Sequence, residues 1–337
     1  MSDDWRPTAT WRALHQRADL KRFVRQFFDE RGYVEVDTPL LSADTVVDAH
    51  IEPIAVRTGG RDMWLQTSPE FAMKRLLAAD CGPMYQLGPA FREGEAGRRH
   101  NPEFTLLEWY RPDDTIEDQI AFVTSLLTAV ADAFPSPRLW RMLVTDNEEG
   151  LSPERVSYDD TFSRSTGLSG LGANASQLAA ALEERGITPP PGLPVEDAYL
   201  DEWRNVTLAE LIEPTLGVGR PTFLTDYPAS QAALARLKPD DPRVAERFEL
   251  YIDGVEYANG YAELTDPAEL RERVAAQNAI RRRDGRPELP TESRLLAAME
   301  AGLPPCAGVA LGFDRLCTLV FGGGSIHDHF AFPFDRA

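Results

Sequence analysis

The chain has 337 residues, of which 43% are hydrophobic, so it is long enough for one large globular domain or two smaller ones. Lys and Arg total 35 against 54 Asp and Glu, and the net charge of −19 disfavours stable binding to nucleic-acid phosphates. Three scattered cysteines argue against a disulfide framework or a zinc site, and neither a signal-peptide pattern nor a membrane span is evident. These features predict a cytoplasmic protein that does not bind membranes.

The first part of the chain predicts a helix followed by strands. Hydrophobic residues at helical spacing indicate a helix over 11–31, which Gly32 ends. Residues 33–36 alternate like a strand before Pro39 interrupts the pattern, and Ser68 is the expected N-cap of a later helix. The further elements expected here are strands over 63–67, 84–92 and 103–111 and helices over 69–79 and 115–133.

The second part predicts a helix-rich insertion and then a hairpin. The insertion covers about 139–237, is dotted with prolines and has no assigned role. In 247–264, two alternating runs flank Asp253 and Gly254, a pair that favours a tight hairpin turn. The last elements expected are a charged helix over 266–283 and a strand at 308–321 that turns into a helix at Gly312. Together these elements predict an α+β fold, an antiparallel sheet flanked by helices, in one domain over 1–337.

The stretch 91–110 carries the strongest indication of chemistry. Arg92 ends one predicted strand, a charged loop follows, and the return strand carries Glu103, Glu108 and Tyr110. An arginine and carboxylates that face each other across a hairpin suit a ligand with an anionic phosphate end and a cationic amine end. The stretch therefore predicts an enzyme that activates an amino acid with a nucleotide.

Two further groups suit a nucleotide. Glu249 and Glu256 lie on opposite arms of the predicted hairpin and can point to one face, where they could hold Mg²⁺ between phosphates. Taken alone, two solvated glutamates are the simpler interpretation. Arg315 lies in the first turn of a predicted helix, a position that attracts phosphate, although an ion pair with Asp314 or a neighbour is the commoner arrangement.

Three other patterns have more than one interpretation. Glu263 follows Glu256 by an odd spacing, which places it on the other face of a strand unless a bulge intervenes, for example at 259–260. Residues 327–329 (HDH) are spaced like metal ligands, but a polar turn is the simpler interpretation. The arginines of 281–283 predict a solvated helix face, with a docking role as the alternative.

In this order the motifs resemble the catalytic core of a class II aminoacyl-tRNA synthetase. The first helix, strand and Pro39 resemble its first motif, which forms the dimer interface in that family, FRE…HNPEF resembles the second, and GVALGFDRL the third. TSPEFAMKRLL, HNPEF, ANGYAEL and GFDRL are similar to the lysyl-tRNA synthetase branch. That enzyme carries an N-terminal anticodon-binding barrel, which we do not expect here because the core begins almost at Trp5. CGPMYQLGPAFR, NPEFTLLEWYRP, PASQAALA and DPRVAERFELY are similar to the stand-alone elongation factor P β-lysine ligase family.

The resemblance implies ATP-dependent activation of (R)-β-lysine as an adenylate, with Mg²⁺, and its transfer to a lysine ε-amine of elongation factor P. It also implies a homodimer. The alternatives are a truncated lysyl-tRNA synthetase that charges tRNA, and a non-catalytic sensor of lysine or nucleotide. The net charge and the missing barrel argue against the first alternative. The retention of both arginines and both metal carboxylates argues against the second.

The resemblance also implies roles for individual residues. The substrate-binding residues are Ser68, Pro69 and Glu70 near the proximal amine, and Glu108, Tyr110 and Glu263 at the distal ε-ammonium. The ATP-binding residues are Arg92 at the α-phosphate, Glu93, Gly94, Asn101, Phe104 stacked on adenine, Glu256, Tyr257, Gly312 and Arg315 at the γ-phosphate. Arg92 and Arg315 form the catalytic pair, and Glu249 and Glu256 hold Mg²⁺. The family's Arg-Asn-Glu run reads Arg92-Glu93-Gly94 here, so the glutamate that meets the adenine amino group is absent, and Glu93 or Glu95 would replace it.

Overall fold

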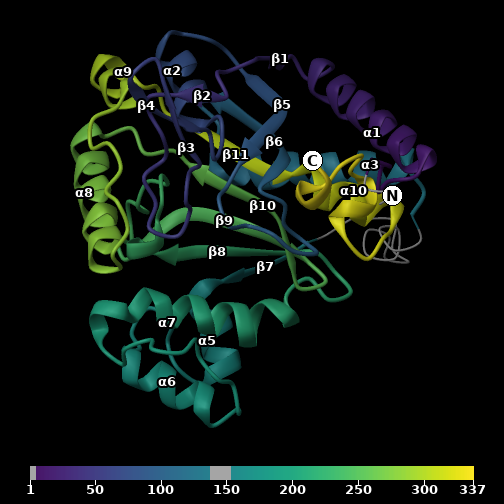
Figure 1. The fold of residues 1–337 in the computed structure, drawn as a ribbon. Coiled ribbons are helices and arrows are strands. Elements are labelled where there is room, and N and C mark those ends of the chain that lie inside the picture. The colour runs from purple at the N-terminus through teal and green to yellow at the C-terminus, as the bar shows by residue number, and fades with distance from the viewer. Residues whose placement is uncertain (1–4, 137–152) are drawn as a thin grey trace. The chain divides into compact units, whose positions relative to one another are not determined.

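The computed structural model describes residues 5–136 and 153–337 (Figure 1). Contacts divide the chain into two compact units, one formed by Met1–Leu139 together with Glu263–Ala337 and the other by Trp140–Ala262. A single domain over 1–337 therefore stays a prediction. The second unit includes the predicted insertion and continues through the predicted hairpin.

The main sheet of the first unit consists of four neighbouring strands. The order is β1 (Val34–Glu35), β5 (Met84–Phe91), β6 (Glu103–Pro112) and β11 (Cys306–Gly312). The β1–β5 pair is parallel, and the other two pairs are antiparallel, so the predicted antiparallel arrangement is confirmed for most of the sheet. A separate small sheet holds β2 (Leu41–Ser42), β4 (Arg61–Leu65) and β3 (Ala55–Thr58). Of its strands, only β4 lies near a predicted one.

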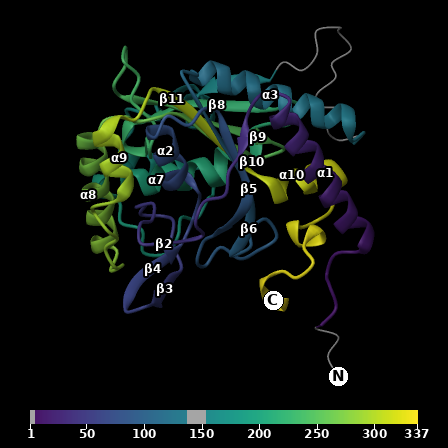
Figure 2. The same ribbon diagram turned by 90° about the horizontal axis from the view of Figure 1, so that it is seen from above.

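Several helices of the first unit begin at side chains that cap them. In α1 (Trp11–Asp29), the Thr10 hydroxyl accepts a hydrogen bond from the backbone N–H of Ala13, and the buried side chains lie at helical spacing. In α3 (Ile116–Ala133), Thr115 and Asp118 form a reciprocal capping box. The other α-helices among the described residues of this unit are α2 (Glu70–Ala78), α8 (Pro267–Arg283), α9 (Arg294–Gly302) and α10 (Phe313–Phe321). Helix α9 packs against α2 and α8 (Figure 2).

The start of α2 differs from the prediction by one residue. Pro69, not Ser68, occupies the N-cap position, and no side chain caps the helix there. The Ser68 hydroxyl instead accepts a hydrogen bond from the backbone N–H of Glu70, at 3.2 Å. Proline has no N–H to donate and a fixed φ, which suits it to a helix start. Glu70 is thereby the first helical residue, near the positive end of the helix dipole.

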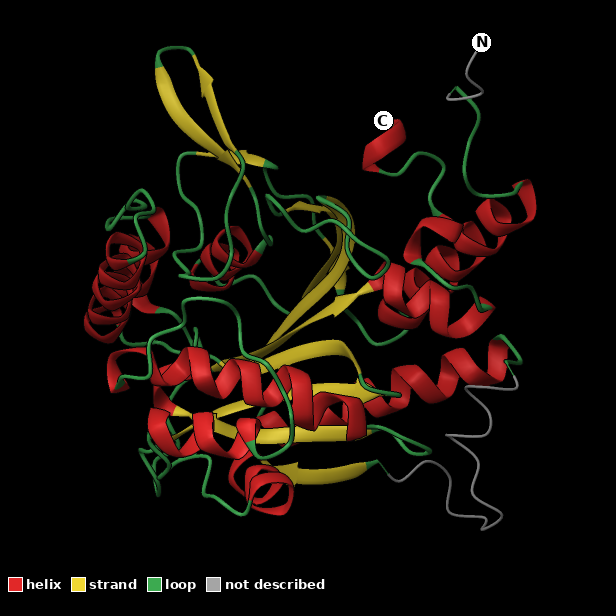
Figure 3. Ribbon diagram, turned by 60° about the horizontal axis from the view of Figure 1, so that its bottom comes forward, coloured by secondary structure: helices red, strands yellow, loops and turns green. Residues whose placement is uncertain are grey.

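The second unit has its own strands in the order β10 (Val255–Ala262), β9 (Val244–Ile252), β8 (Thr222–Pro228) and β7 (Glu154–Ser157). Asp253 and Gly254 join β9 to β10, and both have positive φ, 50° and 69°, as a tight primed turn requires. The predicted hairpin is confirmed. Helices α5 (Tyr158–Thr166), α6 (Ala175–Glu183) and α7 (Leu200–Thr207) pack in one hydrophobic cluster with residues of β7, β8 and β9. In Figure 3, where the bottom of Figure 1 comes forward, helices lie in front of strands in this unit.

The predicted composition of 139–237 is only partly right. The helices are present, but β7 and β8 also fall in this region and pair with each other in parallel, and β8 pairs with β9. Residues 139–152 of this region lie outside the described part of the chain. Within 5–136 and 153–337, the structure has no helix with both the length and the apolar character needed to cross a bilayer.

Candidate functional site

Three carboxylates and a lysine from distant parts of the sequence meet in the first unit. Glu70 opens α2, Glu108 lies in β6, and Glu263 starts the second segment of this unit. Lys74 follows Glu70 by one helical turn, and at most 9% of any of the four residues is exposed. The structure thus brings together three of the residues predicted to bind the substrate amines. The prediction missed Lys74, for which the i, i+4 spacing from Glu70 was the available signal.

Lys74 bridges two of these carboxylates. Its Nζ lies 2.6 Å from Glu70 Oε1 and 2.5 Å from Glu263 Oε2. Burial lowers the pKa of Lys74, but the charges of Glu263 and Glu70 outweigh burial and raise the pKa above its ordinary value. Burial raises the pKa of Glu263 to about 8, and the Lys74 charge opposes this rise. At this separation the lysine keeps the proton, so we describe the group as an ammonium between carboxylates.

Glu108 and Tyr110 point to the same face of β6, since they are two residues apart on a strand. The Tyr110 hydroxyl donates a hydrogen bond to Glu108 Oε1, at 2.7 Å. Burial, followed by the charge of Glu70, raises the pKa of Glu108 to about 8. Among the described residues, Glu108 Oε2 and Glu263 Oε1 are buried without a hydrogen-bond partner. Buried acceptors without donors are the groups that a ligand ammonium would satisfy.

Arg92 follows β5 and is held by three neighbours. Its guanidinium lies over the Phe104 ring, 4.9 Å from the centroid, and its Nε donates to the Thr67 carbonyl at 3.4 Å. Its Nη1 lies 3.6 Å from Glu95 Oε1. Glu95 therefore pairs with the arginine, while the backbone N–H of Glu93 donates to the Glu52 carbonyl at 2.8 Å. A role of Glu93, Gly94 or Phe104 at adenine stays a prediction.

Arg315 is at the start of α10, directly after the β11 strand, as predicted. Its Nη2 lies 2.8 Å from His100 Nε2. Because a guanidinium only donates, His100 Nε2 must accept, which requires a neutral imidazole with its proton on Nδ1. Burial and then the Arg315 charge lower the pKa of His100, in agreement with a neutral ring. Asp314 pairs with Arg17, at 2.6 Å. An ion pair of Arg315 with Asp314 or a neighbour, the alternative to a phosphate contact, stays untested.

Two other residues predicted to lie near ATP have different surroundings. Asn101 is buried; its Nδ2 donates to the Glu103 carbonyl at 2.6 Å, and its Oδ1 accepts from the backbone N–H of Phe334 at 2.9 Å. The three atoms nearest to a Cβ added at Gly312 would all belong to the Arg315 side chain, the first at 3.6 Å. The structure gives Asn101 a role in holding the chain's C-terminal segment. As nucleotide contacts, both residues remain predictions.

The predicted Mg²⁺ carboxylates lie within the second unit. Glu256 is paired with Tyr251, two residues from Glu249, so both carboxylates point to one face of the hairpin. Arg247 forms an ion pair with Glu249 Oε1, and the Tyr251 hydroxyl donates to its Oε2 at 2.6 Å. A register shift occurs between Glu256 and Ala258, at Tyr257, and not at 259–260 as expected. Two oriented carboxylates fit Mg²⁺ once phosphate oxygens complete its shell.

The remaining patterns have structural explanations. Residues 327–329 lie in a short 3-10 turn in which Asp328 caps the chain and His329 Nε2 lies 2.9 Å from the Gly322 carbonyl, so the interpretation as a polar turn is confirmed. In the part of the chain that the structure describes, no group of three or more His, Cys, Asp or Glu side chains could hold a metal.

The arginines of 281–283 were expected to form a solvated helix face. This prediction is wrong for Arg281, which is fully buried and pairs with Glu52 at 2.9 Å.

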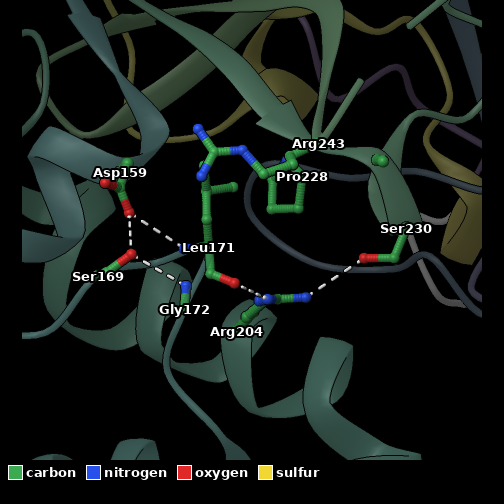
Figure 4. A pocket seen from close by; sticks show the side chains of 9 residues that line it. Asp159, Ser169, Leu171, Gly172, Arg204, Pro228, Ser230 and Arg243 are labelled. Atoms are coloured by element: carbon green, nitrogen blue, oxygen red, sulfur yellow. Dashed lines mark hydrogen bonds between the residues drawn. The ribbon is translucent and has the colours of Figure 1, made fainter. Parts of the chain in front are cut away.

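A hollow of about 500 Å³ lies within the second unit (Figure 4). Arg204, buried at its wall, donates to the Gly170 carbonyl at 3.0 Å and pairs with Asp201 at 2.8 Å. Arg243 pairs with Asp241 at 2.7 Å. Both guanidinium groups thus have partners, and none of the predicted site residues lines the hollow. The residues around it are Asp159, Ser169, Leu171, Gly172, Arg204, Pro228, Ala229, Ser230 and Arg243.

Comparison with known proteins agrees with the motifs. The model of the class II tRNA synthetases for D, K and N matches residues 4–336. An elongation factor P–(R)-β-lysine ligase of Klebsiella pneumoniae (strain 342) is 42% identical over 346 aligned positions, gaps included; the match covers 99% of this chain and 98% of that protein. A ligase of the same name from Salmonella paratyphi B is 41% identical over 343 aligned positions, with the same coverage. The chain therefore belongs to the class II tRNA synthetase family of the D, K and N type.

Proposed function

We propose that the chain is a ligase that activates (R)-β-lysine with ATP and transfers it to a lysine ε-amine of elongation factor P. Relatives that carry this name match nearly the whole chain. The observation that carries the proposal is the buried pair Glu108 and Glu263, whose oxygens Oε2 and Oε1 have no hydrogen-bond partner among the described residues. Buried carboxyl oxygens without donors suit a cationic substrate group, which would supply the missing hydrogen bonds.

The first step joins the carboxylate of β-lysine to ATP. A carboxylate oxygen attacks the α-phosphorus in line, the bond to the β-phosphate oxygen breaks, and pyrophosphate leaves. This step needs no strong protein base, because the nucleophile is already ionised. Its rate depends on positioning and on cations that offset the charge of the phosphates. Arg92 and Arg315 would supply this charge at the α- and γ-phosphates, and Mg²⁺ held by Glu249 and Glu256 would add to it.

The second step moves the aminoacyl group. The acceptor lysine amine, after loss of a proton, attacks the carbonyl carbon of the mixed anhydride, and AMP leaves with the electrons of the broken C–O bond. The residues in contact with the substrate would be Ser68, Pro69 and Glu70 at the proximal amine, and Glu108, Tyr110 and Glu263 at the distal one. The predicted ATP contacts Glu93, Gly94, Asn101, Phe104, Tyr257 and Gly312 belong to the same proposal.

A cytoplasmic homodimer is part of the proposal. Trp11 in α1 and Val34 in β1 belong to the segment that resembles the dimer motif, and they are 75% and 63% exposed. Covering these exposed apolar side chains with a second copy of the chain would remove apolar surface from water, which favours association. Sedimentation of the full chain measures this state, and a Trp11→Glu variant is expected to be monomeric.

Pyrophosphate exchange tests the first step. The protein is incubated with ATP, Mg²⁺ and either α- or β-lysine, and label exchange between pyrophosphate and ATP is followed. We expect exchange with β-lysine, and no exchange with either isomer would contradict the proposal. Elongation factor P and tRNA are then offered separately as acceptors. A mass gain on elongation factor P is expected, and a gain on tRNA alone would favour a truncated lysyl-tRNA synthetase. If pyrophosphate exchange occurs but neither elongation factor P nor tRNA gains mass, the chain forms the adenylate and the proposed transfer step is wrong.

A further inference from the structure

The amine-binding cluster contains a cation that belongs to the protein. Lys74 is 1% exposed, and its Nζ contacts carboxylates at both ends of the cluster, Glu70 at 2.6 Å and Glu263 at 2.5 Å. Its Nζ also lies 6.0 Å from the centroid of the Tyr110 ring. Glu70 and Lys74 share helix α2, which is anchored by buried Phe71, Met73 and Leu77. The helix thereby fixes where the ammonium lies, and the ammonium fixes Glu263.

The charges of this cluster match a substrate with two amines. Glu70, Glu108 and Glu263 carry three negative charges when they are all ionised, and Lys74 cancels one of them. The remaining two correspond to the two ammonium groups of lysine or β-lysine. Without Lys74, the carboxylates of Glu70 and Glu263 would face each other in a buried site with no cation between them. Two buried carboxylates in this position share a proton, and a protonated carboxyl is a poor partner for an ammonium.

We propose that Lys74 is a positioning residue that holds Glu70 and Glu263 in place and favours the ionised form of Glu263, so that the cluster accepts a substrate with two ammonium groups and rejects one that lacks the distal ammonium. Lys74 acts through these carboxylates and does not itself contact the reacting atoms. This inference rests on the proposed function, because it assigns the cluster to the amines of the substrate. Lys74, a residue of helix α2, would thus help to select the substrate in addition to the three glutamates.

The substitution Lys74→Met tests this role, because methionine keeps the length of the side chain and removes its charge. Arg75→Met is the matched control, since Arg75 is the next residue of the same helix and is exposed. The ligands are (R)-β-lysine and 3-aminohexanoate, which has the same carbon chain without the distal amine. Binding to the full-length protein is measured by calorimetry, and KM and kcat are measured by pyrophosphate exchange.

For Lys74→Met we expect the KM for β-lysine to rise about 30- to 100-fold, as for the loss of a charge-assisted contact, with kcat and the KM for ATP within about 3-fold. The preference for β-lysine over 3-aminohexanoate is expected to fall at least about tenfold, because neutral Glu263 no longer distinguishes them. Lys74→Arg keeps the charge and is expected to restore part of the preference. A purely structural ion pair would change stability and leave this preference unchanged.

The controls separate the two hypotheses. If the unaltered protein neither binds β-lysine nor catalyses exchange, the proposed function is wrong. If it does both, while Lys74→Met retains its affinity and its preference within about 3-fold, the inference about Lys74 is wrong. Should Lys74→Met fail to fold, Lys74→Gln decides by the same two criteria, because glutamine still donates hydrogen bonds to a carboxylate and carries no charge.

Discussion

Tyr110 lies over Gly308, its partner in the β6–β11 pair, so closely that a side chain at 308 would overlap the ring. A Cβ at Gly308 would be 2.3 Å from two ring carbons of Tyr110 and 2.9 Å from Glu263 Oε1. Glycine is therefore required on β11 for the tyrosine and the carboxylate to occupy their positions. This relationship connects the third motif of the chain to the amine-binding cluster.

The first prediction concerns Gly308→Ala. The added methyl group must displace Tyr110 or Glu263, so we expect the free energy of unfolding to fall by about 1–3 kcal/mol and the affinity for β-lysine to fall as well. Thermal unfolding and calorimetric titration measure the two effects. Gly82→Ala is the control, because a Cβ at Gly82 meets nothing within 4 Å. A Gly308→Ala variant that binds β-lysine as tightly as the control would show that the position of Tyr110 is not critical.

The second prediction concerns Glu108, whose pKa in the empty site is about 8. At neutral pH this carboxyl is mostly protonated, and an incoming ammonium favours its ionised form, so binding of β-lysine should release a proton. We expect affinity to rise between about pH 6 and 8, and the measured binding enthalpy to depend on the ionisation enthalpy of the buffer. Glu108→Gln should reduce both effects, and the remainder should come from Glu263, whose pKa is also raised to about 8 by burial. An exposed glutamate in α8, changed by Glu272→Gln, provides the control and should retain them.

Glu108 also affects stability in the absence of substrate. Its pKa is raised from the ordinary value of 4.5 to about 8 on folding, so the folded protein binds the proton more tightly than the unfolded chain does. Its contribution to stability is then full below about pH 4.5 and is lost as the pH rises towards 8. Urea unfolding of the unaltered protein and of Glu108→Gln at several pH values measures this difference. An unchanged difference from pH 5 to 8 would contradict the raised pKa.

The sequence predicts the elements around 84–112 well, because alternation and capping residues act locally and can be recognised without knowledge of the fold. The strands β7 and β8 are missed for the opposite reason. β8 is flanked by prolines, and its partners lie elsewhere in the chain, so only pairing identifies it as a strand. Local patterns cannot show which distant segments will pair.

The candidate site follows the same division. The motifs identify Glu108, Tyr110 and Glu263 individually, and the structure shows that they share one buried cluster. The burial of Lys74 and Arg281 is not evident from sequence, because a lysine or arginine on a helix is usually solvated. The i, i+4 spacing of Lys74 from Glu70 indicates an ion pair but not its burial. Their burial becomes apparent only when the chain supplies carboxylates from other elements, Glu263 for one and Glu52 for the other.

The third prediction concerns Arg315→Ala. We expect pyrophosphate exchange to fall by about 100-fold or more, because a cation at the γ-phosphate is lost, while the fold is retained. The contact of Arg315 with His100 also disappears, so the pKa of His100, which burial and then the Arg315 charge lower, should rise towards its ordinary value in the variant. NMR titration of the imidazole measures this change. Arg61→Ala, at an exposed residue of β4, is the control, and near-normal exchange in Arg315→Ala would remove Arg315 from the site.

The last prediction concerns the orientation of Glu249. Its Oε2 accepts a hydrogen bond from the Tyr251 hydroxyl at 2.6 Å, and Arg247 holds its other oxygen. If Glu249 holds Mg²⁺, Tyr251→Phe frees one of its oxygens and should raise the Mg²⁺ concentration required for half-maximal exchange about 10-fold or more, as for other residues that orient metal ligands. Glu246→Gln is the control: it lies on the same strand and pairs with Arg236, and loss of that partly exposed pair should leave the Mg²⁺ requirement unchanged. An equal Mg²⁺ requirement in both variants would mean that Glu249 does not act as a metal ligand, and that its hydrogen bonds serve only the packing of β9.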